Sequence, residues 1–293
     1  MPASATPATI GFVGLGDMGG PMAGNMAKAG LDVLGYDRAG TAERASAGVR
    51  VAADLAAVAA GADAVFVSVP DGKASLAVID ALLAAPDRRF AALVDLSTIG
   101  VDAAEEGGRR LAEAGIAHID APVSGGRTGA LAASIAVMAA GPVGAIEALR
   151  PVFAAFSRRL FVVGDRAGQG QAMKLLNNYL SATAMAATTE AIHFGLAQGL
   201  DFRTMLDVLN ASTGQNTSTS DKFPNRILTQ TYDAGFRTAL MAKDVALYAG
   251  KARQLGTARV LVDEVDAVWR RADAAMPGSD FTRIFPFLTD KPE

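Results

Sequence analysis

The stretch Thr9-Ile-Gly-Phe-Val-Gly14-Leu-Gly16-Asp-Met-Gly19 decides the fold, because it joins a strand to a helix through a glycine-rich turn. Its first five residues are apolar and β-prone, which is typical of a buried parallel strand. Gly14 permits a tight turn, Gly16 lets the backbone approach a pyrophosphate, and Gly19 lets the next helix pack against the strand. The pattern predicts a dinucleotide site, with an ordinary strand-turn-helix corner as the alternative.

A second short strand, Val33 to Tyr36, ends at Asp37. An acidic residue roughly 20 residues beyond the glycines is placed to bind a ribose 2′-hydroxyl and to repel a 2′-phosphate. We therefore expect NAD as the cofactor. Arg38 follows directly, and a guanidinium there would suit a 2′-phosphate, so NADP is the alternative.

Strand-like and helix-like segments alternate up to about residue 165, and the strand pattern then largely disappears. Alternation of this kind predicts an α/β Rossmann-type doubly wound sheet. The helical pattern of the residues that follow predicts an all-α C-terminal domain. We expect the domains to cover residues 1–165 and 166–293. The second should begin with a long interdomain helix, 171–198, that forms the hinge and one wall of a cleft. The expected strands are 9–13, 33–36, 64–70, 93–98, 117–122, 135–139 and 160–163, and the expected helices include 19–28, 103–114, 143–156, 202–210, 239–255 and 260–275.

Composition excludes several classes of protein. The 293 residues carry a net charge of -3 without a basic cluster at either end, which argues against nucleic acid or an anionic membrane as a partner. The absence of cysteine excludes disulfides and thiolate catalysis, and with only two histidines we expect no metal site. Residues 1–7 show no signal peptide and no apolar run would span a bilayer, so we expect a cytoplasmic location.

The second informative segment is Gly168-Gln-Gly-Gln-Ala-Met-Lys174-Leu-Leu-Asn-Asn178. On a helix, Lys174, Asn177, Asn178 and Ser181 share one face of an otherwise Leu-, Met- and Ala-rich segment. A solvated face is the ordinary explanation for such a stripe. It is weakened here because the helix begins where the sheet domain ends, and because asparagines are poor helix formers.

Reduction of a carbonyl by hydride transfer produces an alkoxide that needs a proton or a cation beside it, and a lysine supplies both. The rival acids are badly placed, since His118 is on a strand and His193 is far along the helix. Tyr179 points off the lysine face, and Tyr36 belongs near the adenosine end. Asp120-Ala-Pro-Val-Ser124-Gly125-Gly126 adds a turn whose N–H groups and hydroxyl suit a substrate carboxylate, or is simply a flexible loop.

Four segments together resemble the signatures of the β-hydroxyacid dehydrogenase family, which includes 3-hydroxyisobutyrate dehydrogenase and tartronate semialdehyde reductase. They are the glycine turn, the Asp120–Gly126 segment, the Gly168–Asn178 segment and Leu240-Met-Ala-Lys-Asp244, in the right order over essentially the whole chain. The resemblance implies an enzyme that transfers a hydride between NAD(P) and a short-chain 3-hydroxy acid or its semialdehyde. It also implies a homodimer or homotetramer, which the 51% hydrophobic composition favours as well.

The resemblance assigns a role to each candidate residue. Lys174 would be the general acid/base, and the substrate would be bound by Ser124, Gly125, Gly126, Asn178, Phe236 and Asp244. The cofactor would be bound by Gly14, Leu15, Gly16, Asp17, Met18, Gly19, Asp37, Arg38, Val69, Pro70, Thr98 and Lys243.

Departures from the family pattern leave the substrate open. Val101 stands where a proline often follows the Ser-Thr pair, Ala133-Ser-Ile replaces the usual Gly-Thr-Leu, and Arg127 replaces a neutral residue. Three other classes of protein are alternatives. Lys174 argues against an imine reductase, which normally has another residue there, and the length of the chain argues against a 6-phosphogluconate dehydrogenase, which is larger. A non-catalytic dinucleotide-binding scaffold would keep the glycines but lose Lys174, so the retained polar stripe argues against it.

Overall fold

The structure is a computed structural model and describes residues 7–289. The segment 1–6, which holds most of the stretch in which no signal peptide was expected, lies outside the described residues. The chain divides into two compact units, Met1–Lys174 and Leu175–Glu293.

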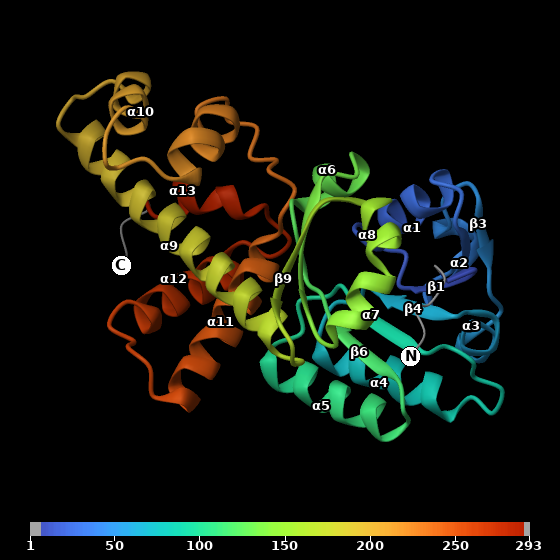
Figure 1. The fold of residues 1–293 in the computed structure, drawn as a ribbon. Helices are drawn as coiled ribbons and strands as arrows, with labels where there is room; N and C mark the ends of the chain where they lie inside the picture. The colour runs from blue at the N-terminus through green and yellow to red at the C-terminus, as the bar shows by residue number, and fades with distance from the viewer. Residues whose placement is uncertain (1–6, 290–293) are drawn as a thin grey trace. The chain divides into compact units, whose positions relative to one another are not determined.

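The first unit is built on a nine-stranded sheet in the order β3-β2-β1-β4-β5-β6-β8-β7, with β9 paired to β8 (Figure 1). The order 3-2-1-4-5-6 is that of a doubly wound dinucleotide-binding fold, whose direction of winding reverses between β1 and β4. Its strands are β1 Thr9–Val13, β2 Asp32–Tyr36, β3 Val49–Val51, β4 Ala64–Val67, β5 Ala92–Asp95, β6 Ala117–Asp120, β7 Val123–Ser124, β8 Ile135–Ala140 and β9 Ser157–Gly164.

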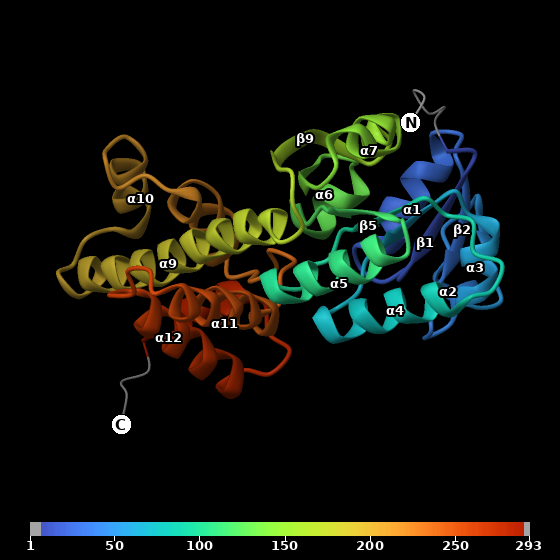
Figure 2. The ribbon, with the colours of Figure 1, turned by 60° about the horizontal axis from the view of Figure 1, so that its bottom comes forward.

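Helices cover both faces of this sheet, and each face has its own apolar core. One core is centred on Phe12, Phe66 and Phe153 and includes side chains of α1, α7 and α8. The other packs Val65 and Leu93 against α3, α4 and α5, and Figure 2 shows α4 beside α5 on that face. The helices of this unit are α1 Gly19–Lys28, α2 Thr41–Arg44, α3 Leu55–Gly61, α4 Gly72–Ala84, α5 Val101–Glu113, α6 Gly126–Leu131, α7 Val143–Ala148 and α8 Arg150–Ala154.

The sheet is parallel except around β8, which runs antiparallel to β6 and β7 and parallel to β9. The prediction of a single helix over 143–156 is wrong in one respect, because the structure has two helices there, α7 and α8, separated at Leu149. Pro151 explains the break. It lacks an N–H and is tolerated only in the first turn of a helix, so a new helix starts at Arg150.

The second unit is helical, so the expected Rossmann-type sheet followed by an all-α part is confirmed. Its core surrounds Trp269, whose Nε1 donates to the carbonyl of Ala182 at 3.3 Å, and includes Phe223 and Met185. The elements are α9 Gln169–Ala197, which begins in the first unit, α10 Phe202–Asn210, a π-helix Ser218–Ile227, α11 Thr238–Leu255, α12 Val262–Ala275, a 3₁₀ turn Phe281–Arg283 and α13 Ile284–Phe287. Within residues 7–289, no helix is both long and apolar enough to span a bilayer.

His118 on β6 gives the fold a testable dependence on pH. It is buried, neither ring nitrogen has a hydrogen-bond partner among the described residues, and burial lowers its pKa from 6.5 to about 4. Between these two values the unfolded chain binds a proton at this ring and the folded chain does not, so stability is lost as the pH falls.

We expect His118→Leu to remove this loss. The free energy of unfolding of the variant relative to the wild type should rise by up to about 3 kcal/mol as the pH falls through that window. Urea titrations at several pH values measure the difference. Burial raises the pKa of Asp120 to about 6, which gives stability the opposite dependence on pH. Because Asp120 is present in both proteins, its contribution cancels in the difference. A difference that does not change with pH would show that His118 is not the cause.

Candidate functional site

The glycine turn after β1 has three glycines that meet different surroundings. Gly14 has a φ of 91° and its N–H donates to the carbonyl of Tyr36 at 2.8 Å, while a Cβ there would lie 2.1 Å from the carbonyl oxygen of Ser68. A Cβ on Gly19 would lie 1.9 Å from the carbonyl oxygen of Gly14. A Cβ on Gly16 would meet nothing within 4 Å. Two glycines therefore serve close packing, and Gly16 faces open space.

This arrangement fits the pyrophosphate of a dinucleotide. The open side of Gly16 lies beside the start of α1, and no side chain of the described residues caps that helix. Gly20 and Met22 already donate to the carbonyl groups of Gly16 and Met18, at 3.0 and 3.2 Å, and Pro21 has no N–H. The helix therefore offers an anion mainly the positive end of its dipole. The polar contacts around the turn continue with the acidic residue after β2.

Asp37 is tied directly to the glycine turn. One carboxylate oxygen accepts from the N–H of Leu15 at 2.8 Å and the other accepts from the N–H of Ala39 at 2.8 Å. Its side chain is 11% exposed and Arg44 lies 3.9 Å away, whereas Arg38 is exposed. The carboxylate is therefore held in place at the edge of the turn.

A cavity of about 410 Å³ runs along α1 from Gly16 and Asp17 to Lys28. Arg127 at the start of α6 lines this cavity together with Arg44. The structure thus places Arg127 beside α1 on an exposed surface.

The turns after β4 and β5 are held together by Ser97. Its hydroxyl accepts from the N–H of Val69 at 2.8 Å, and its own N–H donates to Asp95 at 2.9 Å. Ser75 of α4 donates to the other oxygen of Asp95. Burial raises the pKa of Asp95, and the hydrogen bonds from the two serines oppose that rise. The network fixes the backbone immediately before the predicted cofactor residues Pro70 and Thr98.

Asp120 ends β6 beneath the start of α9. Its carboxylate accepts from the N–H groups of Gly168 and Gln171, both at 3.0 Å, and from the side-chain amide of Gln171 at 2.7 Å. Burial raises the pKa of Asp120 to about 6, and these hydrogen bonds from Gln171 and Gly168 oppose the rise. Asp120 is therefore an anchor for α9.

The Ser124-Gly125-Gly126 turn connects β7 to α6. Gly125 and Gly126 have φ angles of 134° and 62°, so their backbone favours glycine. Within the described part of the chain, no hydrogen bond engages the hydroxyl of Ser124, which is half-buried. The turn can offer a hydroxyl and N–H groups to an anion.

Lys174 lies in the second turn of α9 and is 7% exposed. A buried ammonium is unusual in proteins and calls for a function or a charged partner. Asn178 follows at i+4 on the same helix face and is also buried. The solvated-face alternative for this stripe is therefore wrong for these two residues.

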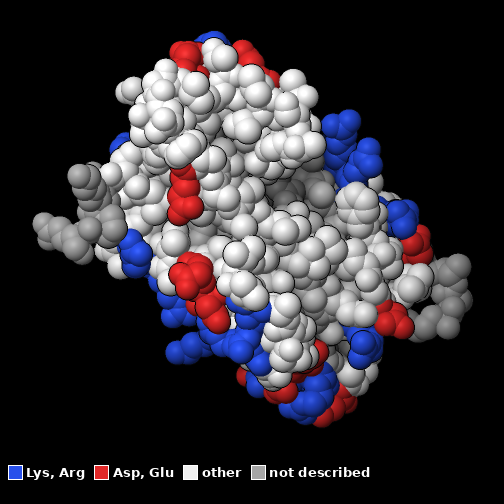
Figure 3. Space-filling view, turned by 90° about the vertical axis from the view of Figure 1, so that its left-hand side faces the viewer, with Lys and Arg blue, Asp and Glu red and all other residues white. Residues whose placement is uncertain are grey.

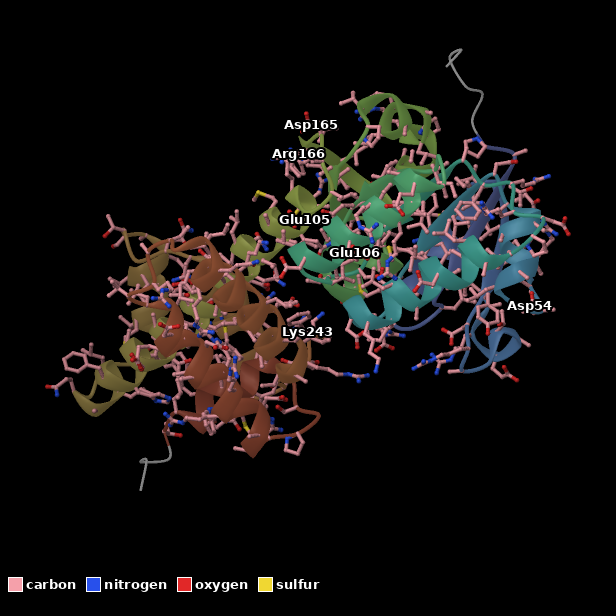
Figure 4. All side chains as sticks on the ribbon, turned by 90° about the horizontal axis from the view of Figure 1, so that it is seen from below. Asp54, Glu105, Glu106, Asp165, Arg166 and Lys243 are labelled. Atoms are coloured by element: carbon pink, nitrogen blue, oxygen red, sulfur yellow. The ribbon has the colours of Figure 1, made fainter. Side chains whose placement is uncertain are left out.

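In the second unit, Asn178 is part of a chain of polar side chains. Its amide donates to Asp244 at 2.6 Å, its oxygen accepts from Asn177 at 3.1 Å, and Lys243 lies 3.3 Å from the other oxygen of Asp244. Lys243, which is labelled in Figure 4, precedes Asp244 on α11. The orientation of the Asn178 amide is thus fixed from both sides.

Phe236 precedes α11 and packs edge-on against Phe281 with ring centroids 5.8 Å apart. Its N–H donates to Asp280 at 3.1 Å, and its side chain is half-buried. Phe236 therefore has a packing role within its own unit.

Sequence reasoning missed Ser97, Asp120 and Gln171 as structural parts of the site. All three lie inside or beside the segments that were singled out. Each is a polar residue in an otherwise apolar segment, and that contrast is the feature of the sequence from which a structural role could have been predicted. In residues 7–289, no cluster of three or more metal-binding side chains is present.

Two family models match the chain. The NAD binding domain of 6-phosphogluconate dehydrogenase matches residues 9–164, and the model described as NAD-binding of NADP-dependent 3-hydroxyisobutyrate dehydrogenase matches residues 168–288.

Relatives match over most of their length. The chain is 33% identical to a 3-hydroxyisobutyrate dehydrogenase of Pseudomonas aeruginosa over 94% of this chain and 96% of that protein. It is 35% identical to an NAD-dependent L-serine dehydrogenase of the same species, over 81% of this chain and 83% of that protein. A solved structure of Mycobacterium tuberculosis 3-hydroxyisobutyrate dehydrogenase with L-serine has a TM-score of 0.89 and 31% identity, covering 96% of this chain and 99% of that one. An imine reductase of Streptomyces aurantiacus, at 22% identity and a TM-score of 0.63, shares the fold alone.

Because Gly16 faces open space and Gly19 is packed against backbone, we expect alanine at Gly16 to weaken cofactor binding and alanine at Gly19 to lower stability. Gly16→Ala should leave the melting temperature within about 2 °C of the wild type, because its Cβ enters open space, and should weaken NADH binding by roughly tenfold or more. Gly19→Ala should lower the melting temperature by more than about 5 °C, because its Cβ clashes with backbone. Thermal unfolding and fluorescence titration with NADH measure both. Unchanged NADH affinity in Gly16→Ala would remove this turn from the cofactor site.

Proposed function

Because the chain belongs to the β-hydroxyacid dehydrogenase family, we propose that it transfers a hydride between NAD(P) and a short 3-hydroxy acid or its semialdehyde. The observation that carries this proposal is the buried Lys174, with Asn178 one turn further along the same helix face. The names of the relatives support the same class of substrate, since they act on 3-hydroxyisobutyrate and L-serine.

In the proposed reaction, Lys174 handles the proton of the substrate hydroxyl. Bound NAD(P) supplies the hydride acceptor or donor. In oxidation, the neutral amine of Lys174 accepts the hydroxyl proton. In reduction, its ammonium donates a proton to the developing alkoxide and stabilises the negative charge.

The remaining predicted residues hold the reactants. We assign the substrate carboxylate to Ser124, Gly125 and Gly126, whose hydroxyl and N–H groups suit an anion. We assign the substrate hydroxyl to Asn178, whose amide is oriented by Asn177 and Asp244. Lys243, with Phe236 and Asp244, completes the predicted site, and Leu15, Asp17, Met18, Val69, Pro70 and Thr98 complete the cofactor site.

We also propose a homodimer or homotetramer in the cytoplasm. Large apolar side chains of the helical unit are exposed, among them Leu180, Phe194 and Val208. Much of the face in Figure 3 carries no charged side chain, which suits contact with another copy. Light scattering at micromolar concentration distinguishes these states from a monomer.

Lys174→Ala should abolish most turnover and leave cofactor binding intact. Removal of a positioned general acid typically lowers the rate by about 10²–10⁴, and the lost ammonium adds to that loss. NADH affinity should change little, because the glycine turn and Asp37 are untouched. Steady-state kinetics on a panel of 3-hydroxy acids and direct NADH titration test this.

Lys222→Ala is the matched control, because that lysine pairs with Asp221 in the π-helix. Near-normal kcat in Lys174→Ala would rule out the proposed acid. Lost NADH binding with an intact fold would instead make Lys174 a cofactor ligand.

Asp37 should set a preference for NAD over NADP. Its carboxylate is held at the glycine turn by the N–H of Leu15, where it would accept from a 2′-hydroxyl and repel a 2′-phosphate. We expect kcat/KM to be higher with NAD, and Asp37→Ala to narrow the ratio between the two cofactors. A clear NADP preference in the wild type would assign Arg38 the dominant role.

A further inference from the structure

The side chain of Gln171 makes four hydrogen bonds although it is fully buried. Its oxygen accepts from the N–H of Ile99 at 2.8 Å and from the N–H of Gly100 at 3.1 Å. Its nitrogen donates to the carbonyl of Ser97 at 3.0 Å and to Asp120 at 2.7 Å. One amide therefore links the turn after β5 to the end of β6.

These bonds lie on both sides of Thr98. The partners before and after it in the chain are the carbonyl of Ser97 and the N–H of Ile99. Ser97 in turn accepts from the N–H of Val69, so the turn after β4 joins the same network. Gln171 thus holds the turn after β5 directly and the turn after β4 through Ser97, and cofactor binding is assigned to these two turns.

The same residue belongs to the first turns of α9. Asp120 accepts from the N–H groups of Gly168 and Gln171, which the helix leaves without intrahelical partners. A Cβ on Gly170 would lie 2.6 Å from the carbonyl oxygen of Asp120 and 2.7 Å from that of Met138. The helix is therefore pressed against β6 and β8 at a distance that only glycine allows.

Lys174 follows Gln171 at i+3, so the two side chains leave the same side of α9 one turn apart. We propose that Gln171 is a positioning residue that fixes Lys174 relative to the turns carrying Val69 and Thr98. The proposal rests on the proposed function, in which Lys174 is the acid/base. Near neutral pH, the carboxamide of glutamine offers both a donor and an acceptor at this length, whereas an ionised glutamate offers acceptors alone.

Gln171→Ala should lower kcat by roughly ten- to a hundredfold, because small misplacements of a catalytic group have effects of that size. KM for the 3-hydroxy acid should change by less than about threefold, since the carboxylate turn is untouched. The primary deuterium isotope effect on kcat should rise, because hydride and proton transfer become slower than product release.

Hydrogen exchange of the cofactor-free protein gives a readout independent of turnover. The amides of Ile99 and Gly100 should lose protection in Gln171→Ala. Gln169→Ala is the matched control, because that side chain lies two residues earlier and accepts only locally from the N–H of Arg166 at 2.9 Å. It should keep wild-type kcat within about twofold and leave the exchange of both amides unchanged.

A second variant keeps the test decisive if Gln171→Ala folds poorly. Gln171→Glu retains the acceptor but places a carboxyl against Asp120, with Asp95 of β5 as the other charged group nearby. Two such carboxyls share a proton at low pH and repel each other at high pH. The turnover of this variant relative to the wild type should therefore rise as the pH falls from about 8 to about 5.5.

The outcomes separate the two proposals. A wild type that turns over no 3-hydroxy acid would defeat the proposed function. An active wild type with normal kcat in Gln171→Ala, or with the same loss in Gln169→Ala, would overturn the positioning role alone. Unchanged exchange at Ile99 and Gly100, or a pH-independent ratio for Gln171→Glu, would also overturn it.

Discussion

The buried carboxylate of Asp120 at the start of α9 is the interaction on which the arrangement of the first unit depends. A carboxylate in an apolar interior is unfavourable unless donors surround it, and three donors from Gly168 and Gln171 do so. Two of them are N–H groups at the positive end of a long helix, which favours the charged form. The helix start and the strand end therefore stabilise each other.

Asp95 shows the same principle on the neighbouring strand. It is fully buried and receives hydrogen bonds from Ser75 and Ser97. Because β5 and β6 are adjacent and parallel, their carboxyl ends place Asp95 and Asp120 at the same edge of the sheet. This edge, next to the turns where a doubly wound sheet binds its ligands, is thus built from buried acids whose donors come from three different loops and helices.

Much of the fold could be predicted because it depends on short-range patterns. The packing of Gly14 and Gly19 follows from backbone sterics, and the limits of α10 follow from its apolar spacing and the Asp201 cap. The split of α7 from α8 and the π-helix around Pro224 could not be read from apolar spacing, since backbone geometry decides them. The cofactor and substrate contacts of the individual residues stay predictions.

The polar network of the site was harder to predict because its partners are distant in sequence. Gln171 contacts residues 51 to 74 positions earlier, and Asn178 contacts Asp244, 66 positions later. Local spacing shows that such residues share a helix face, but it does not identify the partner of each side chain. For Gln171, that information depends on which strand ends meet, and it becomes available only once the order β4-β5-β6 is known. For Asn178, it depends on which residues of α11 lie beside α9 in the second unit.

Burial then separates the two explanations of the polar stripe on α9. A solvated stripe would keep its charged residue in water, whereas Lys174 and Asn178 are both withdrawn from it. Burying a lysine is unfavourable unless its charge is compensated, so a buried lysine indicates a partner for the charge, a function for it, or both. In the proposed function, Lys174 is the proton donor on a helix that Gly170, Gln171 and Asp120 hold in place, and such a rigid support would keep its ammonium in one position through the reaction.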